Sequence, residues 1–155
     1  MGIFVWLEQT WLADWVRVSV LGYPLMITCH AIGMAVMVGL ASVVGLRLLG
    51  AFRSLPYSAL DRFFAIAWLG FGVNLLSGIG LFASQATSYA VNGVFLTKLA
   101  FVFLGAIAVA YLQAAAVRSP VADAAPPSAS VRAVAAASLI FWTGAIVMGR
   151  LTAYL

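Results

Sequence analysis

The residues of this chain with the clearest capacity for chemistry are one histidine and two methionines in an apolar run. His30 is the only histidine, and Met26 and Met34 lie four residues before and after it. Because an α-helix repeats every ~3.6 residues, the three side chains share one face of the helix that the run predicts. An imidazole inside a membrane-spanning helix is energetically unfavourable and is therefore a candidate functional group.

The residue types around His30 leave three interpretations open. In the first, the imidazole only forms a hydrogen bond with a neighbouring helix. In the second, it is an axial ligand of haem b or a hydrogen-bond donor to a quinone. In the third, His30, Met26 and Met34 bind copper, since thioether sulfur and imidazole nitrogen suit Cu(I). Methionine also fills gaps between apolar helices, so the same stripe is compatible with packing alone.

A haem would need a second axial ligand, and the sequence restricts the choice. One histidine excludes a bis-histidine haem within one chain. The sixth ligand is then Met148, Lys98 or a residue of another subunit, or the iron stays five-coordinate. No serine–histidine–aspartate or paired-carboxylate pattern is recognisable. If the protein takes part in catalysis, we expect it to act as an electron-transfer subunit of an oxidoreductase.

Composition indicates the elements that must position these groups. Of 155 residues, 65% are hydrophobic and 8% charged, against about 45–50% apolar and ~25% charged in soluble domains. The apolar residues concentrate in four runs, about 20–49, 62–83, 94–117 and 131–154. Such runs match a ~30 Å hydrocarbon core, and short connections make neighbouring helices antiparallel. The sequence predicts an all-α, up-down-up-down four-helix transmembrane bundle, a single membrane domain over residues 1–155.

Composition also excludes other classes of protein. One cysteine rules out an internal disulfide framework and a cysteine-based zinc site. The eight basic residues are dispersed between apolar runs and form no patch, so we expect no nucleic-acid partner.

Residues 3–18 form a different kind of segment. Trp6, Trp11, Trp15 and Val18 recur at helical spacing, with polar residues between them. Tryptophan favours the headgroup region of a bilayer. We therefore expect one amphipathic helix that lies in the membrane interface.

The distribution of basic residues predicts the orientation. Two loops, 50–61 and 118–130, are flanked by five arginines: Arg47, Arg53, Arg62, Arg118 and Arg132. The positive-inside rule places both loops in the cytoplasm and both termini on the outer side.

This topology brings polar residues of different helices to one depth. His30, Lys98 and Arg150 each lie near the outer end of a predicted helix, and Asn92 and Tyr154 belong to the same leaflet. The long side chains of lysine and arginine could simply reach the headgroups. The functional alternative is a cationic pocket that opens to the outer leaflet. The nearest carboxylates are those of the amphipathic segment, Glu8 and Asp14.

Small and polar residues predict helix contacts. Ala31, Ala35 and Gly39 recur every four residues and are expected to let another helix approach closely. Asn74 lies near the middle of its predicted span, where a buried amide needs hydrogen-bond partners. We expect Asn74 to bond a neighbouring helix.

Four stretches of the chain carry a resemblance to a known family. They are YPLMITCH at 23–30, GLRLLG at 45–50, YAVNGVFLTK at 89–98 and WTGAIVMGRLTAY at 142–154. With them the chain resembles an uncharacterised family of small bacterial four-span membrane proteins. That family is distantly similar to the copper-resistance D proteins and to b-type cytochrome bundles.

The resemblance has implications for location and site. It implies a bacterial multi-pass protein, and together with the orientation from the positive-inside rule this predicts the inner (cytoplasmic) membrane with both termini in the periplasm. It highlights these residues: His30, Arg47, Asn92, Lys98, Arg150 and Tyr154. Such relatives often have a second histidine late in the third span, where this chain has Gln113. This departure weakens the implication of haem.

These observations give one leading hypothesis and two alternatives. The leading hypothesis is an integral membrane subunit whose outer-leaflet pocket binds haem b or a quinone and relays electrons. The alternatives are copper handling through the Met-His-Met face and a structural membrane anchor without a ligand. We expect contact with the lipid bilayer and either a protein partner or a homo-oligomer. The predicted cofactor-binding residues are His30, Lys98, Arg150, Asn92, Tyr154 and Met148.

Overall fold

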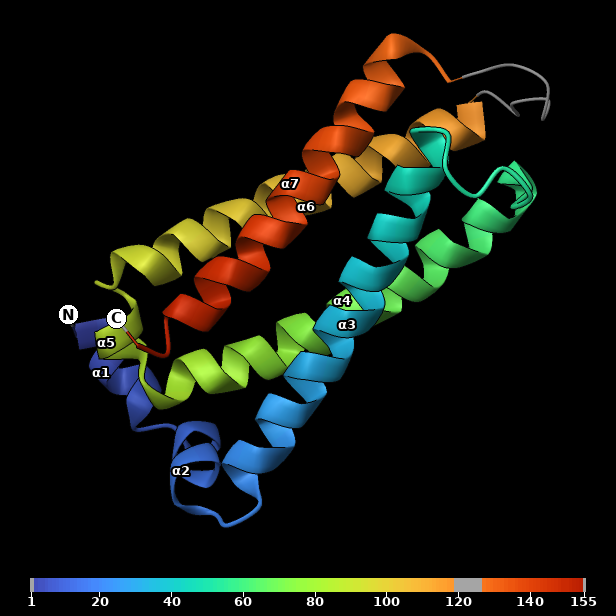
Figure 1. The fold of residues 1–155 in the computed structure, drawn as a ribbon. Coiled ribbons are helices and arrows are strands. Elements are labelled where there is room, and N and C mark those ends of the chain that lie inside the picture. The colour runs from blue at the N-terminus through green and yellow to red at the C-terminus, as the bar shows by residue number, and fades with distance from the viewer. Residues whose placement is uncertain (1, 119–126, 155) are drawn as a thin grey trace.

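The computed structural model describes residues 2–118 and 127–154, and the regular structure in these ranges is helical (Figure 1). The long helices of this described part are α3 (Gly22–Leu48), α4 (Leu60–Ser84), α6 (Gly93–Arg118) and α7 (Ala129–Leu151). The short ones are α1 (Gly2–Glu8), α2 (Trp11–Val18), the 3-10 helix η1 (Tyr57–Ala59) and α5 (Ala86–Tyr89). The predicted all-α four-helix bundle is confirmed.

Within the described residues, four segments are long and apolar enough to cross a membrane, and each coincides with all or most of one of the long helices. They have 23 to 28 residues. At ~1.5 Å per residue this is roughly 35–42 Å, which exceeds a ~30 Å hydrocarbon core. Large apolar side chains on these helices are exposed, among them Leu69, Leu76, Phe103 and Ile140. These features support a multi-pass membrane protein in contact with lipid.

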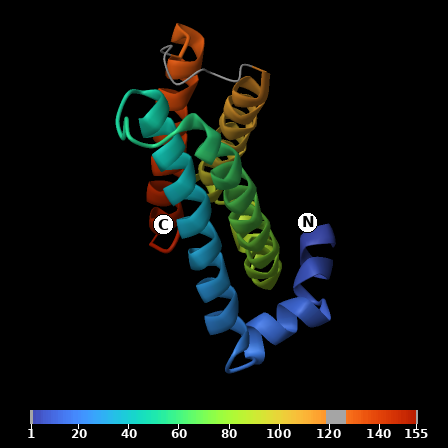
Figure 2. The same ribbon diagram turned by 90° about the vertical axis from the view of Figure 1, so that its right-hand side faces the viewer.

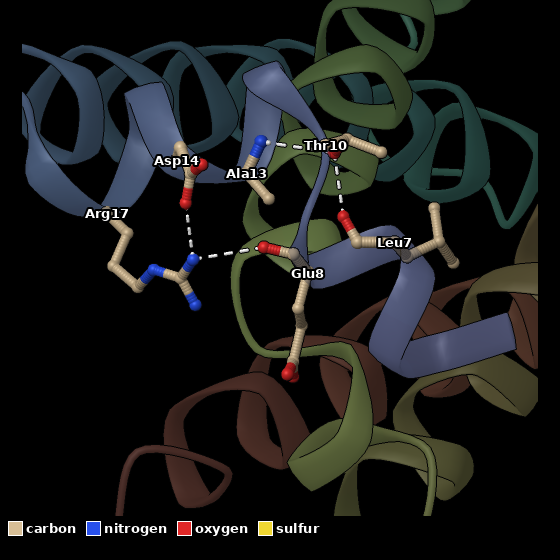
Figure 3. Close-up of polar contacts among 6 residues, drawn as sticks. All are labelled: Leu7, Glu8, Thr10, Ala13, Asp14 and Arg17. Atoms are coloured by element: carbon tan, nitrogen blue, oxygen red, sulfur yellow. Dashed lines mark hydrogen bonds and ion pairs between the residues drawn. The ribbon is translucent and has the colours of Figure 1, made fainter. Parts of the chain in front are cut away.

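The N-terminal segment is two helices rather than the single helix expected over residues 3–18. Thr10 is the N-cap of α2: its Oγ1 accepts the N–H of Ala13 at 3.4 Å and donates to Leu7 O at 2.7 Å (Figure 3). A threonine at this position satisfies a backbone N–H that lacks a partner at a helix start. The chain therefore turns between α1 and α2.

The amphipathic pattern nevertheless describes how α2 packs. Ala13 and Val16 are fully buried, whereas Trp11 is 78% exposed and stacks on Trp15. The helix lies against α3 and α4, while α1 contacts α5 and α4. Figure 2 shows both N-terminal helices beside the end of α4. The interfacial position of this segment stays a prediction.

The four long helices form two antiparallel pairs, α3 with α4 and α6 with α7, and contacts between α3 and α7 join the pairs. In Figure 1 the pairs separate toward the end that carries α1, α5 and the C-terminus. Buried apolar side chains form the core in the other half, near the α3–α4 connection. They are Met37, Ala41, Val44, Leu48, Leu60, Phe64, Ala67, Val109, Leu112, Ala135, Trp142 and Ala145. The core therefore occupies only part of the length of the bundle. Residues 119–126 of the predicted loop 118–130 lie outside the described residues.

The α3–α4 pair crosses at two glycines. A Cβ atom added to Gly33 would lie 2.6 Å from Asn74 N and 2.7 Å from Gly70 O, so the two backbones touch there. A Cβ atom on Gly70 would lie 2.7 Å from Val36 Cγ1. In a bilayer, close packing of this kind drives helix association because lipid tails are as apolar as the side chains.

The stripe expected to make a close helix contact is exposed instead. Ala31, Ala35 and Gly39 are exposed, and a Cβ atom on Gly39 would meet nothing within 4 Å among the described residues. Gly33 lies two residues beyond Ala31, about 200° around the helix axis. The contact with α4 thus uses the opposite face of α3. Both faces carry small residues, so their spacing alone could not predict which face makes the contact.

Arg47 fixes the connection between α3 and α4. It is only 7% exposed; its Nε donates to Leu55 O at 2.6 Å and its Nη1 to Tyr57 Oη at 3.2 Å. The guanidinium carbon lies 4.0 Å from the centroid of the Tyr57 ring. These contacts compensate the burial of the charge. Arg47 therefore has a structural role at the packed end of the bundle.

The glycine crossing generates a stability prediction with a control on the same helix. We expect Gly33→Ala to lower the free energy of unfolding by about 1–3 kcal/mol, because the added methyl group must push two backbones apart. Gly39→Ala should change it by less than about 0.5 kcal/mol, since its site is open. The measurement is an SDS titration in mixed micelles, followed by circular dichroism. Equal effects of the two substitutions would contradict the crossing.

Candidate functional site

A cavity of about 550 Å³ lies between the two helix pairs, in the half of the bundle away from most of the core. Its lining comes from α3, α4, α6 and α7, together with Tyr89 at the end of α5 and Thr152 and Ala153 directly after α7. Half-exposed apolar side chains such as Leu75, Ile79 and Leu99 are part of the lining, so the cavity is open at its side. The polar residues of the lining are Tyr23, His30, Asn74, Tyr89, Lys98, Arg150 and Thr152.

His30 is positioned by a reciprocal pair of hydrogen bonds with α4. Its Nδ1 lies 3.0 Å from Asn74 O, and Asn74 Nδ2 donates to His30 O at 2.8 Å. The prediction that Asn74 bonds a neighbouring helix is confirmed. Ser77 Oγ lies 3.3 Å from the same Nδ1, and the ring rests on Gly78, whose Cβ atom would be 3.1 Å from Cε1.

These bonds determine the tautomer of His30. A carbonyl oxygen can only accept, so Nδ1 carries the proton that it donates to Asn74 O. In the neutral imidazole, Nε2 then has a free lone pair. No hydrogen bond to Nε2 is found among the described residues. His30 can therefore ligate a metal through Nε2, or accept a hydrogen bond from a hydroxyl group.

Lys98 and Arg150 reach the same cavity from α6 and α7. The stem of Lys98 runs along Gly149, where an added Cβ atom would lie 3.4 Å from Lys98 Cε, and its Nζ is 5.9 Å from the centroid of the Phe95 ring. Arg150 Nη2 donates to Tyr154 Oη at 2.9 Å. The structure thus brings Lys98, Arg150 and His30 together from three helices.

Aromatic rings form one wall of the cavity. The ring of Phe95 stacks on two neighbours. Its centroid lies 5.6 Å from that of Phe82 and 5.0 Å from that of Tyr89. All three line the cavity. Partial burial raises the pKa of Tyr89, with a smaller effect from Tyr23, so the Tyr89 hydroxyl is neutral at physiological pH.

The remaining predicted cofactor residues lie outside the lining. Asn92 caps α6, where its Oδ1 accepts the N–H of Phe95 at 2.9 Å. Tyr154 contacts Arg150 but does not itself line the cavity, and neither does Met148. Gln113, at the position where the resembling family often has histidine, accepts the Trp68 Nε1–H at 2.8 Å, and neither residue lines the cavity.

The predicted copper ligands are only partly brought together. Met34 lines the cavity with His30, whereas the sulfur of Met26 packs against Gly80, 3.2 Å from where a Cβ atom would be. In the described part of the chain, no group of three His, Cys, Asp or Glu residues could hold a metal ion. Copper binding rests on methionine sulfur and stays a prediction.

The carboxylates of the N-terminal segment have other partners than Lys98 and Arg150. Glu8 Oε1 accepts from Thr87 N at 2.8 Å and from Thr87 Oγ1 at 2.7 Å. Asp14 pairs with Arg17 at 2.6 Å, and Arg17 also donates to Glu8 O (Figure 3). The segment therefore fastens to α5 and contributes no residue to the lining. Among the described residues, no carboxylate pairs with either cavity cation.

Comparison of the chain with protein-family models, with curated proteins and with solved structures finds no match in any of the three. The resemblance based on the four sequence stretches therefore stays a prediction, and the site is interpreted from its own geometry.

Sequence reasoning missed several residues of this site. Phe82 and Phe95 of the aromatic wall were not predicted, because aromatic residues are common throughout apolar helices. Trp142 was also missed, although it lies near His30 in the structure: both line a small chamber described below. A tryptophan far from the predicted membrane interface was the available signal, since its N–H requires an acceptor.

The Glu8 contact gives a prediction about pH. The side-chain and main-chain hydrogen bonds from Thr87 lower the pKa of Glu8 below 4.5. A lowered folded-state pKa means that the contact stabilises the fold fully above the unfolded value and is lost as pH falls through the folded value. We expect the Thr87 amide resonance to titrate with a midpoint below 4.5, the ordinary Glu value.

Two variants test the assignment of that titration. In Glu8→Gln the amide of Thr87 should no longer titrate, because the group at position 8 has lost its proton equilibrium. In Asp14→Asn, the matched control on α2, the titration should persist. A titration unchanged by Glu8→Gln, or a midpoint at or above 4.5, would show that Glu8 does not hold Thr87 as described.

Proposed function

We propose that the cavity binds a lipid-soluble quinone or quinol, and that the chain is a membrane subunit of an electron-transfer system. The observation that carries the proposal is the convergence of nitrogen groups from three helices, His30 on α3, Lys98 on α6 and Arg150 on α7, on one apolar cavity. The proposal includes the bacterial inner membrane with both termini periplasmic, and a protein partner that exchanges electrons with the ligand.

The size and lining of the cavity suit a ligand of this class. Its volume of about 550 Å³ lies within the ~300–1,000 Å³ typical of small-molecule sites. The apolar, half-exposed side chains Ile27, Ile79 and Leu99 offer a path for an isoprenoid tail toward the lipid. The stacked wall around Phe95 offers ring faces for a planar head group.

The charges favour a ligand with hydrogen-bond acceptors. Lys98 and Arg150 carry donors and no acceptors, and neither pairs with a carboxylate among the described residues. A cation at membrane depth requires an acceptor. The two carbonyl oxygens of a quinone supply acceptors, and the hydroxyl of a quinol supplies a donor for the free Nε2 of His30.

A second candidate, haem b, is favoured by the tautomer of His30. A metal-ligating histidine characteristically donates its other ring N–H to a carbonyl or carboxylate, as Nδ1 of His30 does with Asn74 O. Nε2 would hold the iron, which supplies one-electron chemistry when bound, and Lys98 and Arg150 would face the propionates. Met148, the other sixth-ligand candidate besides Lys98, does not line the cavity.

Binding measurements on charge variants test the quinone proposal. We expect Lys98→Gln and Arg150→Gln each to weaken the binding of decylubiquinone to protein in detergent micelles about ten- to hundredfold, as expected for loss of a charged hydrogen bond worth ~1.5–3 kcal/mol. Arg132→Gln, which removes a charge near the start of α7, is the matched control and should bind as the wild type. Quenching of tryptophan fluorescence provides the readout.

The protein purified from membranes separates the candidates. No quinone in its organic extract together with no titratable binding of decylubiquinone would refute the quinone proposal. A Soret band that is lost in His30→Ala would establish haem instead. Copper retained by the wild type and lost in both His30→Ala and Met34→Leu would favour the Met-His-Met alternative.

A further inference from the structure

A second, much smaller chamber lies beside the main cavity. Its volume is about 10 Å³, and four polar residues contribute to its lining: His30, Asn74, Lys98 and Trp142. Three of them, His30, Asn74 and Lys98, also line the main cavity, so the two spaces share a wall. A chamber of this size is close to the ~10–15 Å³ that one water-sized group needs.

Trp142 has an unsatisfied donor. Its side chain is 4% exposed, and its Nε1–H has no hydrogen-bond partner among the described residues. A buried donor without a partner is unfavourable by about the free energy of a lost hydrogen bond, so an acceptor is expected. The other such atom in the described part of the chain, Ser138 Oγ, belongs to a residue outside this chamber.

We propose that the chamber is an oxygen-binding subsite, in which one oxygen atom accepts hydrogen bonds from Trp142 Nε1–H and Lys98 Nζ–H. With ligand bound, this atom is a carbonyl oxygen of the quinone or a phenolate oxygen of the deprotonated quinol; without ligand, it is the oxygen of an ordered water. This assignment rests on the proposed function for the identity of the ligand, but the water-bound state does not depend on it.

The donor and acceptor types of the lining select this chemistry. Trp142 and Lys98 can only donate, so an atom that binds both must be an acceptor. An ammonium or guanidinium group would face like charge and would leave the indole N–H unpaired. A water molecule meets these requirements, because it can accept hydrogen bonds from Trp142 and Lys98 and donate one to the free lone pair of His30 Nε2.

The size of the chamber makes it selective for the shape of the head group. About 10 Å³ admits one oxygen and no substituent on it, so a methyl ether at that position should be excluded. Trp142 thereby acts as a specificity-determining residue, since it both donates to the oxygen and forms a wall. The indole itself is held in place by Gly105, whose Cβ atom would lie 2.9 Å from the Trp142 ring, and by edge contact with Phe71.

The test combines a substitution with a spectroscopic probe of the indole. We expect Trp142→Phe to weaken decylubiquinone binding three- to tenfold, the size of one neutral hydrogen bond. Trp68→Phe is the matched control, because it removes an indole donor that contacts Gln113 away from the cavity, and its affinity should equal that of the wild type. In ¹⁵N–¹H spectra of the wild-type protein, the Trp142 indole signal should shift when decylubiquinone binds and should show a cross-peak to bound water when it is absent.

The probe remains usable if Trp142→Phe does not fold. The chain has five tryptophans, so the Trp142 signal can be assigned by elimination from Phe variants of the other four. If decylubiquinone binds the wild type but the Trp142 signal does not move, the subsite is refuted while the proposed function stands. If decylubiquinone does not bind at all, the proposed function fails, and the water cross-peak decides: its presence supports the subsite and its absence overturns it.

Discussion

The backbone contact between α3 and α4 at Gly33 and Gly70 is the constraint on which the site depends. It brings the two helices close enough for Asn74 Nδ2 to reach His30 O and for His30 Nδ1 to reach Asn74 O. In a low-dielectric interior, such hydrogen bonds are strengthened and an unpaired partner would be unfavourable. The crossing therefore fixes the ring, the tautomer and the free nitrogen of His30 together.

The cavity exists because close packing is unequal along the bundle. Within each pair, glycines allow close contact: Gly33 and Gly70 in one, Gly105 and Gly144 in the other. Between the pairs, the contact of α3 with α7 lies in the core half, where a Cβ atom on Gly45 would meet Leu139 at 3.3 Å. In the other half, Phe82 of α4 stacks on Phe95 of α6, and this contact forms one wall of the cavity without filling the space between the pairs. A site formed between two rigid hairpins can hold side chains from all four helices.

The fold could be predicted from the sequence to a large extent, and the site only in part. Apolar runs long enough to cross a bilayer determine the helices, because lipid leaves backbone polar groups no other partners. The common depth of His30, Lys98 and Arg150 followed from topology alone. What periodicity could not supply was the rotation of each helix about its axis. For that reason a helix contact was expected at the face of α3 that carries Gly39, whereas α4 contacts the face that carries Gly33. Met26 was likewise grouped with Met34, although its sulfur packs on Gly80.

The N-terminal segment illustrates a second limit, since its amphipathic pattern was readable but its docking place was not. The sequence left open whether Glu8 or Asp14 neutralises Lys98 and Arg150, whereas in the structure Glu8 binds the main chain and side chain of Thr87. The Glu8 carboxylate forms two charge-assisted hydrogen bonds with Thr87 at contact distance. Such bonds are stronger than the attraction to a cation that the carboxylate does not contact. The edge contact of Phe4 with Phe82 reinforces this docking. Through α5 the segment holds Tyr89 against Phe95 at the cavity wall, so it shapes the site while contributing no residue to it. Lys98 and Arg150 in the cavity lining are therefore left without a carboxylate partner among the described residues.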